Sequence, residues 1–168
     1  DKFGIQWNDI IEIYSSAVKM KGLKVNGLTI HIGSQILDIE PFKISFLKIA
    51  SLVQKLREKG LSVETIDLGG GIGINYNLNE NYSKLHKSYG DIIKEIISPL
   101  NCKIILEPGR SILANAGILI SKVIYNKVGE SKNFLIIDAA MNDLLRPALY
   151  DAYHDIISVK ESDKKIHF

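Results

Sequence analysis

Three short segments combine residue types that bind anions and hold protons: His31-Ile32-Gly33-Ser34, Asp67-Leu68-Gly69-Gly70-Gly71 and Glu107-Pro108-Gly109-Arg110. Glycines expose backbone N–H groups that an anion can approach closely, and phosphate is the natural ligand of such a loop. A flat imidazole suits the face of a ring-shaped ligand, and a carboxylate suits a protonated ring nitrogen. Phosphate binding and contact with a ring-shaped ligand are therefore the functional interpretations that these segments allow.

Each segment also has a plain structural interpretation. The glycine run can be a turn that needs positive φ angles. It is not a dinucleotide fingerprint, because Ile74 stands where a third glycine or alanine belongs, and no Gly-Lys-Ser/Thr follows for a Walker loop. Taken singly, His31 is more often a hydrogen-bonded core residue and Ser34 a turn residue. Glu107 can pair with Arg110, three residues on, instead of with a ligand.

Hydrophobic periodicity and turn residues predict the elements around these segments. Helices are expected over about 8–20, from Pro41 to Gly60, and over about 82–97, ended by Pro99. Short apolar runs predict strands at 28–32, 63–68 and 103–107. Strands that alternate with helices require right-handed crossovers and a parallel sheet. The sequence therefore predicts an α/β fold.

All three polar segments follow strands, so they are expected to meet at the carboxyl edge of the sheet. This is the edge at which parallel α/β folds build their active sites. After Gly117 the pattern changes, and 118–128 and 134–137 are predicted as strands with no long helix between them. We therefore expect an α/β domain over 1–115 and the start of a mainly β domain over 116–168.

Composition excludes several classes of protein. Of the 168 residues 46% are hydrophobic and 24% charged, which is too apolar for a disordered chain. The net charge of +2 has no block that would bind nucleic acid or anionic lipid, and no apolar run is long enough to span a membrane. The one cysteine, Cys102, is expected to pack inertly in the core, and it fits a reducing, cytoplasmic compartment. No cluster has the spacing of metal ligands, so no metal is expected.

Arginine is scarce: 18 of the 21 basic residues are lysines, and only Arg57, Arg110 and Arg146 remain. A chain that uses lysine wherever a positive charge suffices is expected to retain arginine where a planar guanidinium group must bind a carboxylate or phosphate through two hydrogen bonds. Arg146 lies in a run over 138–150 that mixes charged and small residues, and this run is either a surface loop or a carboxylate site formed with Tyr150.

No motif surrounds His86, His154 or His167, which are expected at the surface.

The motifs, in their order along the chain, resemble the diaminopimelate decarboxylase family of pyridoxal-phosphate enzymes, which have the alanine-racemase-like fold. The resemblance rests on four segments, His31-Ile-Gly-Ser-Gln, Asp67-Leu-Gly-Gly-Gly-Ile-Gly, Glu107-Pro-Gly-Arg and Met141-Asn-Asp-Leu-Leu-Arg-Pro-Ala-Leu-Tyr. The opening Lys2-Phe3-Gly4 also fits. The Arg-Pro-Ala-Leu-Tyr stretch of the last segment favours this family over the related ornithine and arginine decarboxylases. The glycine and Glu-Pro-Gly-Arg motifs are shared more widely among these relatives.

The resemblance implies a fragment of a longer enzyme that lacks both ends: the later part of a (β/α)8 TIM-type barrel, which binds the cofactor, followed by the start of a mainly β domain. It also implies a homodimer with active sites at its interface. It implies the decarboxylation of meso-2,6-diaminopimelate to L-lysine. His31 would stack on the ring of pyridoxal 5'-phosphate, and Glu107 would pair with the pyridinium nitrogen. The phosphate would be held by Ser34, by Gly69, Gly70 and Gly71, and by backbone from Glu107 through Gly109 to Arg110. The distal carboxylate of the substrate would be held by Arg110, Arg146 and Tyr150.

Two catalytic residues of the family are not expected within these 168 residues. The lysine that holds the cofactor is expected before the first residue, and the cysteine that donates a proton is expected after Phe168. No catalytic residue is therefore assigned here, and these 168 residues alone are expected to be inactive. Two alternatives stay open: a decarboxylase of another basic amino acid, whose distal amine would call for acidic residues in place of Arg146 and Tyr150, or a non-catalytic cofactor-binding homologue.

Overall fold

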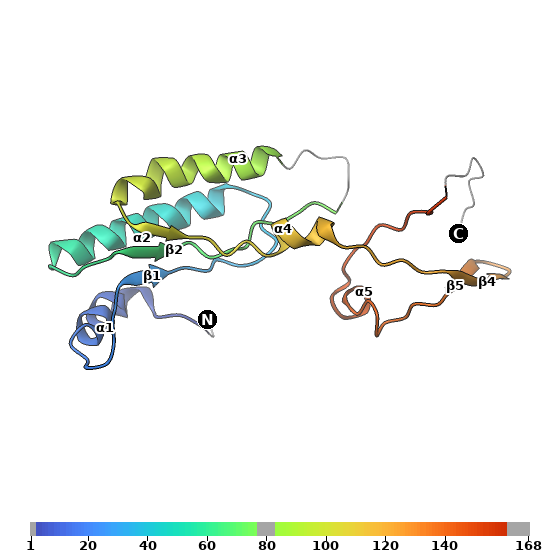
Figure 1. Cartoon of the computed structure of the whole chain (residues 1–168), viewed down its shortest axis with the longest axis horizontal. Coiled ribbons are helices and arrows are strands. Elements are labelled where there is room, and N and C mark those ends of the chain that lie inside the picture. The colour runs from blue at the N-terminus through green and yellow to red at the C-terminus, as the bar shows by residue number, and fades with distance from the viewer. Residues whose placement is uncertain (1–2, 77–82, 161–168) are drawn as a thin grey trace. The chain divides into compact units, whose positions relative to one another are not determined.

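The structure, a computed structural model, describes residues 3–76 and 83–160 (Figure 1). The chain divides into two compact units, Asp1–Ile74 with Asn81–Ala114 and Asn75–Glu80 with Asn115–Phe168. The first unit holds α1 (Ile10–Ala17), β1 (Gly27–Thr29), α2 (Glu40–Glu58), β2 (Thr65–Asp67), α3 (Ser83–Ile92), β3 (Lys103–Ile105) and α4 (Arg110–Leu113). The second holds β4 (Val123–Val128), β5 (Asn133–Ile137) and α5 (Arg146–Tyr150).

The sheet of the first unit has the order β1-β2-β3, with both pairs parallel, which confirms the predicted α/β alternation. The regular strands are shorter than predicted. Ladder hydrogen bonds nevertheless continue past them, because Leu68 N donates to Ile105 O at 3.0 Å and Glu107 N donates to Gly69 O at 2.9 Å. The polar segments are thus tied to one another by backbone as they leave the sheet. The three strands do not close into a barrel within the described residues.

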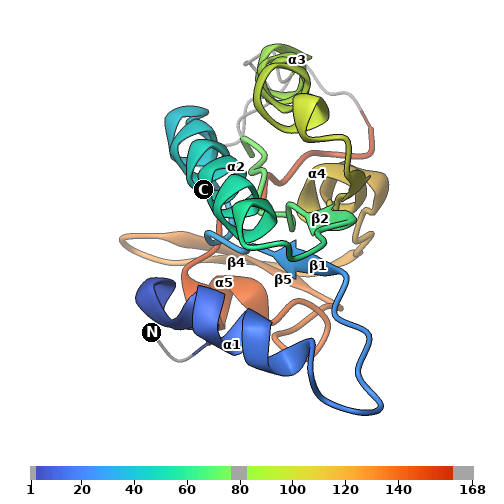
Figure 2. The same cartoon turned by 90° about the vertical axis from the view of Figure 1, so that its left-hand side faces the viewer.

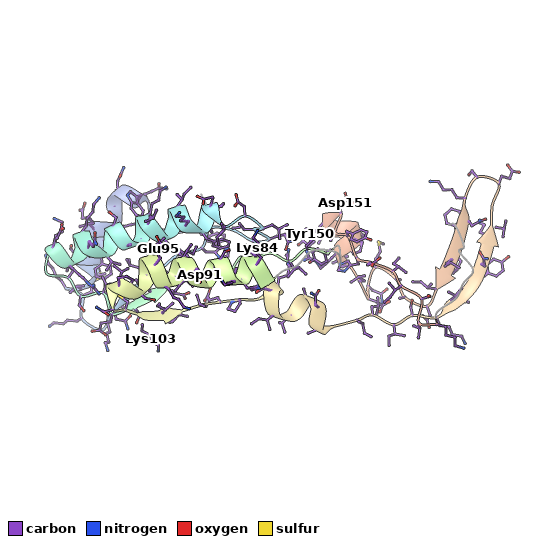
Figure 3. All side chains as sticks on the ribbon, turned by 90° about the horizontal axis from the view of Figure 1, so that it is seen from above. Lys84, Asp91, Glu95, Lys103, Tyr150 and Asp151 are labelled. Atoms are coloured by element: carbon purple, nitrogen blue, oxygen red, sulfur yellow. The ribbon has the colours of Figure 1, made fainter. Side chains whose placement is uncertain are left out.

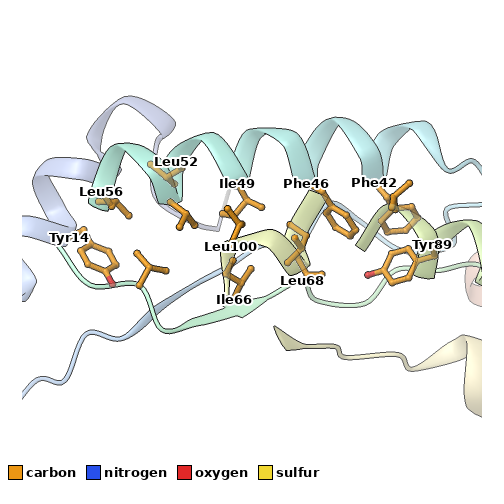
Figure 4. Packing of buried hydrophobic residues seen from close by; sticks show 14 of the residues in the cluster. Tyr14, Phe42, Phe46, Ile49, Leu52, Leu56, Ile66, Leu68, Tyr89 and Leu100 are labelled. Atoms are coloured by element: carbon orange, nitrogen blue, oxygen red, sulfur yellow. The ribbon is translucent and has the colours of Figure 1, made fainter. Parts of the chain in front are cut away.

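The helix α2 confirms the prediction for the segment after Pro41. Proline lies in its first turn, where a missing N–H costs nothing, and Gly60, at φ +74°, follows its end. Its apolar face packs on β2 and α3, so the core runs along the whole helix (Figure 4). The rings of Phe42 and Phe46 meet the ring of Tyr89 edge-on, with centroids 5.1 and 5.5 Å away. These contacts fix α3 against α2.

Two helix boundaries differ from the prediction. The first helix ends at Ala17 rather than near Met20, and a 3-10 turn over Trp7–Asp9 precedes it. The third helix changes at Ile93–Ile97 to π-helical hydrogen bonding and then to a 3-10 turn over Ser98–Leu100, so helical structure passes Pro99 instead of ending before it. Pro99 lies in the first turn of that 3-10 segment, where no backbone N–H is needed and proline is therefore tolerated.

The two faces of the sheet differ in burial. Ile66 is fully buried beneath α2 and α3, which lie above β1 and β2 in Figure 2, whereas α1 lies below β1. On the opposite face Thr29, Asp67 and Ile105 align across the three strands, and none of them is buried. This second face is left uncovered by the described residues of the first unit.

Charged side chains lie on the exposed side of the third helix, where Figure 3 labels Lys84, Asp91 and Glu95. Lys87 Nζ lies 3.4 Å from Asp91 Oδ2, one helical turn away, a spacing worth a few tenths of a kcal/mol. Across 3–76 and 83–160, no helix is both long and apolar enough to cross a membrane.

In the second unit, β4 and β5 pair antiparallel, with Val123 opposite Ile137. Strands are predicted over 118–128 and 134–137, but the structure begins β4 only at Val123, and 118–122 are not in a strand. Every residue of both strands is exposed. A lone two-stranded hairpin is marginally stable in water. These strands therefore need additional protein surface to bury their apolar side chains.

Candidate functional site

The three strand-end segments converge at the carboxyl edge of the sheet, as predicted. Glu107 N binds Gly69 O, and Ile36 N donates to Gly71 O at 2.9 Å, so the loops after β1, β2 and β3 lie side by side. An isolated parallel bridge between Ile36 and Ile72 adds a second link. The glycine run lies in the middle and contacts both neighbouring loops.

Each glycine of the run lets one neighbouring backbone come close. A Cβ on Gly69, Gly70 or Gly71 would collide with a carbonyl oxygen, namely that of Ile30, Glu107 and Gly33 respectively. Gly69 and Gly71 also have positive φ angles of +65° and +98°, which side chains disfavour. The interpretation as a turn is therefore right for the backbone of these two residues.

The N–H groups of the run are not all used. Gly69 N donates to Asp67 Oδ1 at 2.9 Å. Within the described residues, the N–H groups of Gly70 and Gly71 have no acceptor. Gly70 is buried, and a buried N–H without a partner costs about 1–3 kcal/mol. An anion placed there would satisfy it, so the run can be both a tight turn and an anion site.

Beside the run lies a pocket of about 340 Å³, lined by Gly69, Gly70, Ile72, His86, Tyr89, Leu106, Pro108, Ser111 and Ile112. Sequence reasoning missed two polar members of this lining. Ser111 directly follows the Glu107–Arg110 motif, and that adjacency was the available signal. His86, expected to be a plain surface residue, lies one helical turn before Tyr89 on α3, and only the packing of α3 brings it to this pocket.

His31 and Ser34 are both exposed. The interpretation of His31 as a hydrogen-bonded core residue is wrong, because within the described residues its ring makes no hydrogen bond. Its Nδ1 would lie 3.5 Å from a Cβ on Gly69, so the imidazole borders the glycine run. A side chain held there without an internal partner is available to a ligand.

The Glu107 carboxylate is exposed and, among the described residues, forms neither a hydrogen bond nor an ion pair. Its candidate internal partner is engaged elsewhere, since Arg110 Nη1 donates to Gln35 Oε1 at 2.9 Å. The interpretation that pairs Glu107 with Arg110 is therefore wrong for this structure. The backbone of Glu107 lies against Gly70 at the edge of the sheet.

Gln35 was missed as a site residue, although it belongs to the first motif. It lies in the loop after β1 with a left-handed φ of +59°. Its side chain contacts Ile74 in the loop after β2 and Arg110 after β3. It thus links all three strand ends, over sequence separations of 39 and 75 residues.

The second unit brings Arg146 and Tyr150 together. They lie one turn apart on α5, and the Arg146 Cζ atom is 5.3 Å from the centre of the Tyr150 ring, a cation–π distance. Tyr150 is 65% exposed. The short helix covers 146–150, whereas 138–145 form turns and irregular structure that is mostly exposed, as expected for a surface loop. In the same unit His154 differs from the expected surface residue, because its Nε2 is shielded from solvent.

Cys102 packs against the apolar cluster, as expected. Its Sγ donates to Val63 O and accepts from Arg57 Nη2, both at 3.2 Å, and Arg57 Nη2 also donates to Val63 O. This arginine therefore has a structural role on α2. Within the described ranges, no group of three or more histidine, cysteine or acidic side chains is placed to hold a metal.

The Tyr89 hydroxyl provides a test of the packing behind the pocket. Burial, and after it the charge of Asp67, raises the pKa of Tyr89 from 10.0 to about 12. Because the folded phenol resists ionisation more than the unfolded one, its contribution to stability is complete below pH 10 and is lost as the pH rises towards 12. Between these values we expect the free energy of unfolding to fall by on the order of 1–2 kcal/mol more in the wild type than in Tyr89→Phe.

The measurement is urea unfolding of the full-length protein at about pH 9 and about pH 11.5. The control is Tyr125→Phe, whose ring is 61% exposed and whose variant should follow the wild type. Equal losses in the wild type and in Tyr89→Phe would contradict the burial of this hydroxyl.

Residues 1–114 match the family described as pyridoxal-dependent decarboxylase, pyridoxal binding domain. Diaminopimelate decarboxylase from Zymomonas mobilis is 45% identical over 161 residues, which are 96% of this chain and 38% of that protein. The enzyme from Aquifex aeolicus is 44% identical over 98% of this chain and 39% of its own length. The chain thus spans about two fifths of the curated relatives it matches.

Solved structures of decarboxylases resemble this chain as well. The crystal structure of diaminopimelate decarboxylase from Helicobacter pylori complexed with L-lysine superposes with a TM-score of 0.87 at 40% identity, over 97% of this chain and 40% of that one. SrLDC, solved in complex with PLP and cadaverine, superposes with a TM-score of 0.79 over 91% of this chain and 40% of that one. At 23% identity the second likeness shows a shared fold only.

Proposed function

Because the chain belongs to the family of pyridoxal-dependent decarboxylases, we propose that the full-length protein converts meso-2,6-diaminopimelate to L-lysine and carbon dioxide with pyridoxal 5'-phosphate. The observation that carries this is the glycine run, which lies between two other strand ends and in which the N–H of the buried Gly70 has no acceptor among the described residues. Relatives named for this activity are about 45% identical over nearly the whole chain, which supports the choice of substrate.

The residues present fit the phosphate of that cofactor. Gly70 and Gly71 offer N–H groups that have no acceptor among the described residues, and the absence of a Cβ lets the loops after β1 and β3 pack closely against them. We assign the Ser34 hydroxyl and the backbone of Gly109 and Arg110 to the same phosphate, together with Gly69, which shapes the turn. These donors come from three strand ends, so the site forms only when the sheet is assembled.

His31 and Glu107 are assigned to the ring of the cofactor. When bound, the cofactor supplies an electron sink that accepts the electron pair left as carbon dioxide departs. Glu107 holds a proton at the ring nitrogen, which its unpaired carboxylate can do without breaking an internal ion pair. His31 covers one face of the ring, and its exposed imidazole, which forms no hydrogen bond with the described residues, supports that role.

Arg110, Arg146 and Tyr150 are assigned to the distal carboxylate of the substrate. A guanidinium fork binds a carboxylate through two hydrogen bonds, and a site built for that charge rejects substrates that leave the arginines unpaired. The contact between Arg146 and Tyr150 supports treating them as one binding element. A substrate with a distal amine would be repelled by the same charges.

Membership of this family also suggests the architecture of the full-length protein. We propose that 1–115 are part of a (β/α)8 barrel and that 116–168 begin a mainly β domain of a cytoplasmic homodimer. The uncovered face through Thr29, Asp67 and Ile105 supports the barrel, because further strands would enclose it. The exposed apolar residues of β4 and β5 support a larger β domain.

The test is carbon dioxide release by the full-length protein with added cofactor, from meso-diaminopimelate, L-lysine, L-ornithine and L-arginine. We expect release from diaminopimelate alone, with one L-lysine formed for each carbon dioxide. Release from lysine or ornithine instead would favour the related basic-amino-acid decarboxylases. Cofactor binding with no release from any substrate would favour a non-catalytic homologue.

The 168 residues expressed alone are expected to release no carbon dioxide from diaminopimelate. The resemblance assigns the lysine that holds the cofactor and the cysteine that donates a proton to segments other than these motifs. The same assay on the isolated polypeptide with added cofactor measures this, and turnover above the rate of free cofactor would refute it.

A further inference from the structure

The side chain of Gln35 makes three hydrogen bonds to two other loops. Its Nε2 donates to Ile74 O, and its Oε1 accepts from Ile74 N at 3.2 Å and from Arg110 Nη1 at 2.9 Å. Both Gln35 and Arg110 are half-buried. These contacts cross from the loop after β1 to the loops after β2 and β3.

The partners fix the orientation of the amide. Ile74 N–H and the guanidinium are both donors, so they require the oxygen, and Ile74 O requires the nitrogen. A flipped amide would set donor against donor at two places. The paired bonds to the Ile74 backbone therefore hold the amide plane, and the amide oxygen in turn holds one nitrogen of the Arg110 fork.

We propose that Gln35 is a positioning residue that presets the Arg110 guanidinium for the carboxylate of the substrate. This inference rests on the proposed function, which assigns Arg110 to that carboxylate. A neutral amide suits the task because it fixes the fork and leaves its positive charge unneutralised. An acidic residue at this position would bind the guanidinium more strongly but would cancel that charge.

A purely local role in the turn makes a different prediction. Gln35 has a left-handed backbone, φ +59°, which asparagine tolerates better than glutamine does. If position 35 served the turn alone, Gln35→Asn would be neutral or stabilising. If it positions Arg110, asparagine fails because it is one methylene too short to reach Arg110 while bonded to Ile74.

The experiment is calorimetric titration of the full-length holoenzyme with L-lysine, which retains the distal carboxylate, and with cadaverine, which lacks it. We expect Gln35→Asn and Gln35→Glu each to raise the Kd for lysine about tenfold, the scale of one hydrogen bond to a charged group. The Kd for cadaverine should stay within about twofold. In an Arg110→Met background the Gln35 substitutions should have no further effect on lysine binding, because Gln35 acts through Arg110.

Cofactor absorbance and the thermal unfolding midpoint establish that each variant is folded and loaded. An unchanged lysine Kd in Gln35→Asn, or equal losses for lysine and cadaverine, would overturn the inference. So would additive effects of the Gln35 and Arg110 substitutions. If the wild type binds lysine but decarboxylates no diaminopimelate, the proposed function fails while the Kd ratios still decide the role of Gln35. If it binds no lysine, both fail.

Discussion

Replacing Glu107 with glutamine is expected to lower kcat of the full-length enzyme by about 10²- to 10³-fold, the scale of losing one preorganised charge at a reacting centre. The amide cannot hold a proton at the ring nitrogen as a carboxylate does, so the cofactor would accept the electron pair of the departing carbon dioxide less readily. The fold should be unaffected, because within the described residues the Glu107 carboxylate bonds to nothing. Cofactor content should therefore stay close to that of the wild type.

The measurement is single-turnover carbon dioxide release from meso-diaminopimelate by loaded enzyme. Glu95→Gln is the matched control. Glu95 is an exposed carboxylate in the π-helical segment Ile93–Ile97 that follows α3, outside the proposed site, so its replacement should not change kcat (Figure 3). A Glu107→Gln enzyme with wild-type kcat would remove this residue from the ring nitrogen.

Replacing Gly70 with alanine is expected to abolish stoichiometric cofactor binding. The new Cβ would collide with the carbonyl oxygen of Glu107, and a backbone atom cannot turn aside as a side chain can. The loops after β2 and β3 must separate, which spoils the donor geometry around the phosphate. Forced overpacking of this kind also costs about 1–3 kcal/mol of stability.

Gly90→Ala is the control for this substitution. Gly90 lies within α3 with open space where its Cβ would be, so alanine should stabilise the helix by about 0.5–1 kcal/mol and leave cofactor binding unchanged. The readouts are cofactor absorbance per protein chain and the urea midpoint. A Gly70→Ala protein that binds cofactor as tightly as the wild type would show that the glycine run does not hold the phosphate.

Periodicity and turn residues predicted the helix–strand order of the first unit correctly, because each element carries its own local signals. Pro41 and Gly60 bracket α2, and the apolar spacing between them matches the buried face. The meeting of His31, Gly70 and Glu107 at one edge was also predictable. It follows from the topology of parallel strands and needs no knowledge of packing.

Contacts between distant side chains were not predictable in this way. The bond between Gln35 and Arg110 spans 75 residues and depends on a left-handed backbone that no pattern signals at a glutamine. His86 reaches the pocket only because Tyr89 packs between two phenylalanines of α2 and thereby sets the rotation of α3.

The most direct measurement is a crystal structure of the full-length protein grown with pyridoxal 5'-phosphate. The account predicts density for a phosphorylated pyridine at the carboxyl edge of the sheet. Its phosphate should lie within hydrogen-bond reach of Gly70 N, its ring nitrogen within reach of the Glu107 carboxylate, and its face against His31. Cofactor bound elsewhere, or packed hydrocarbon filling the space between these three residues, would contradict it.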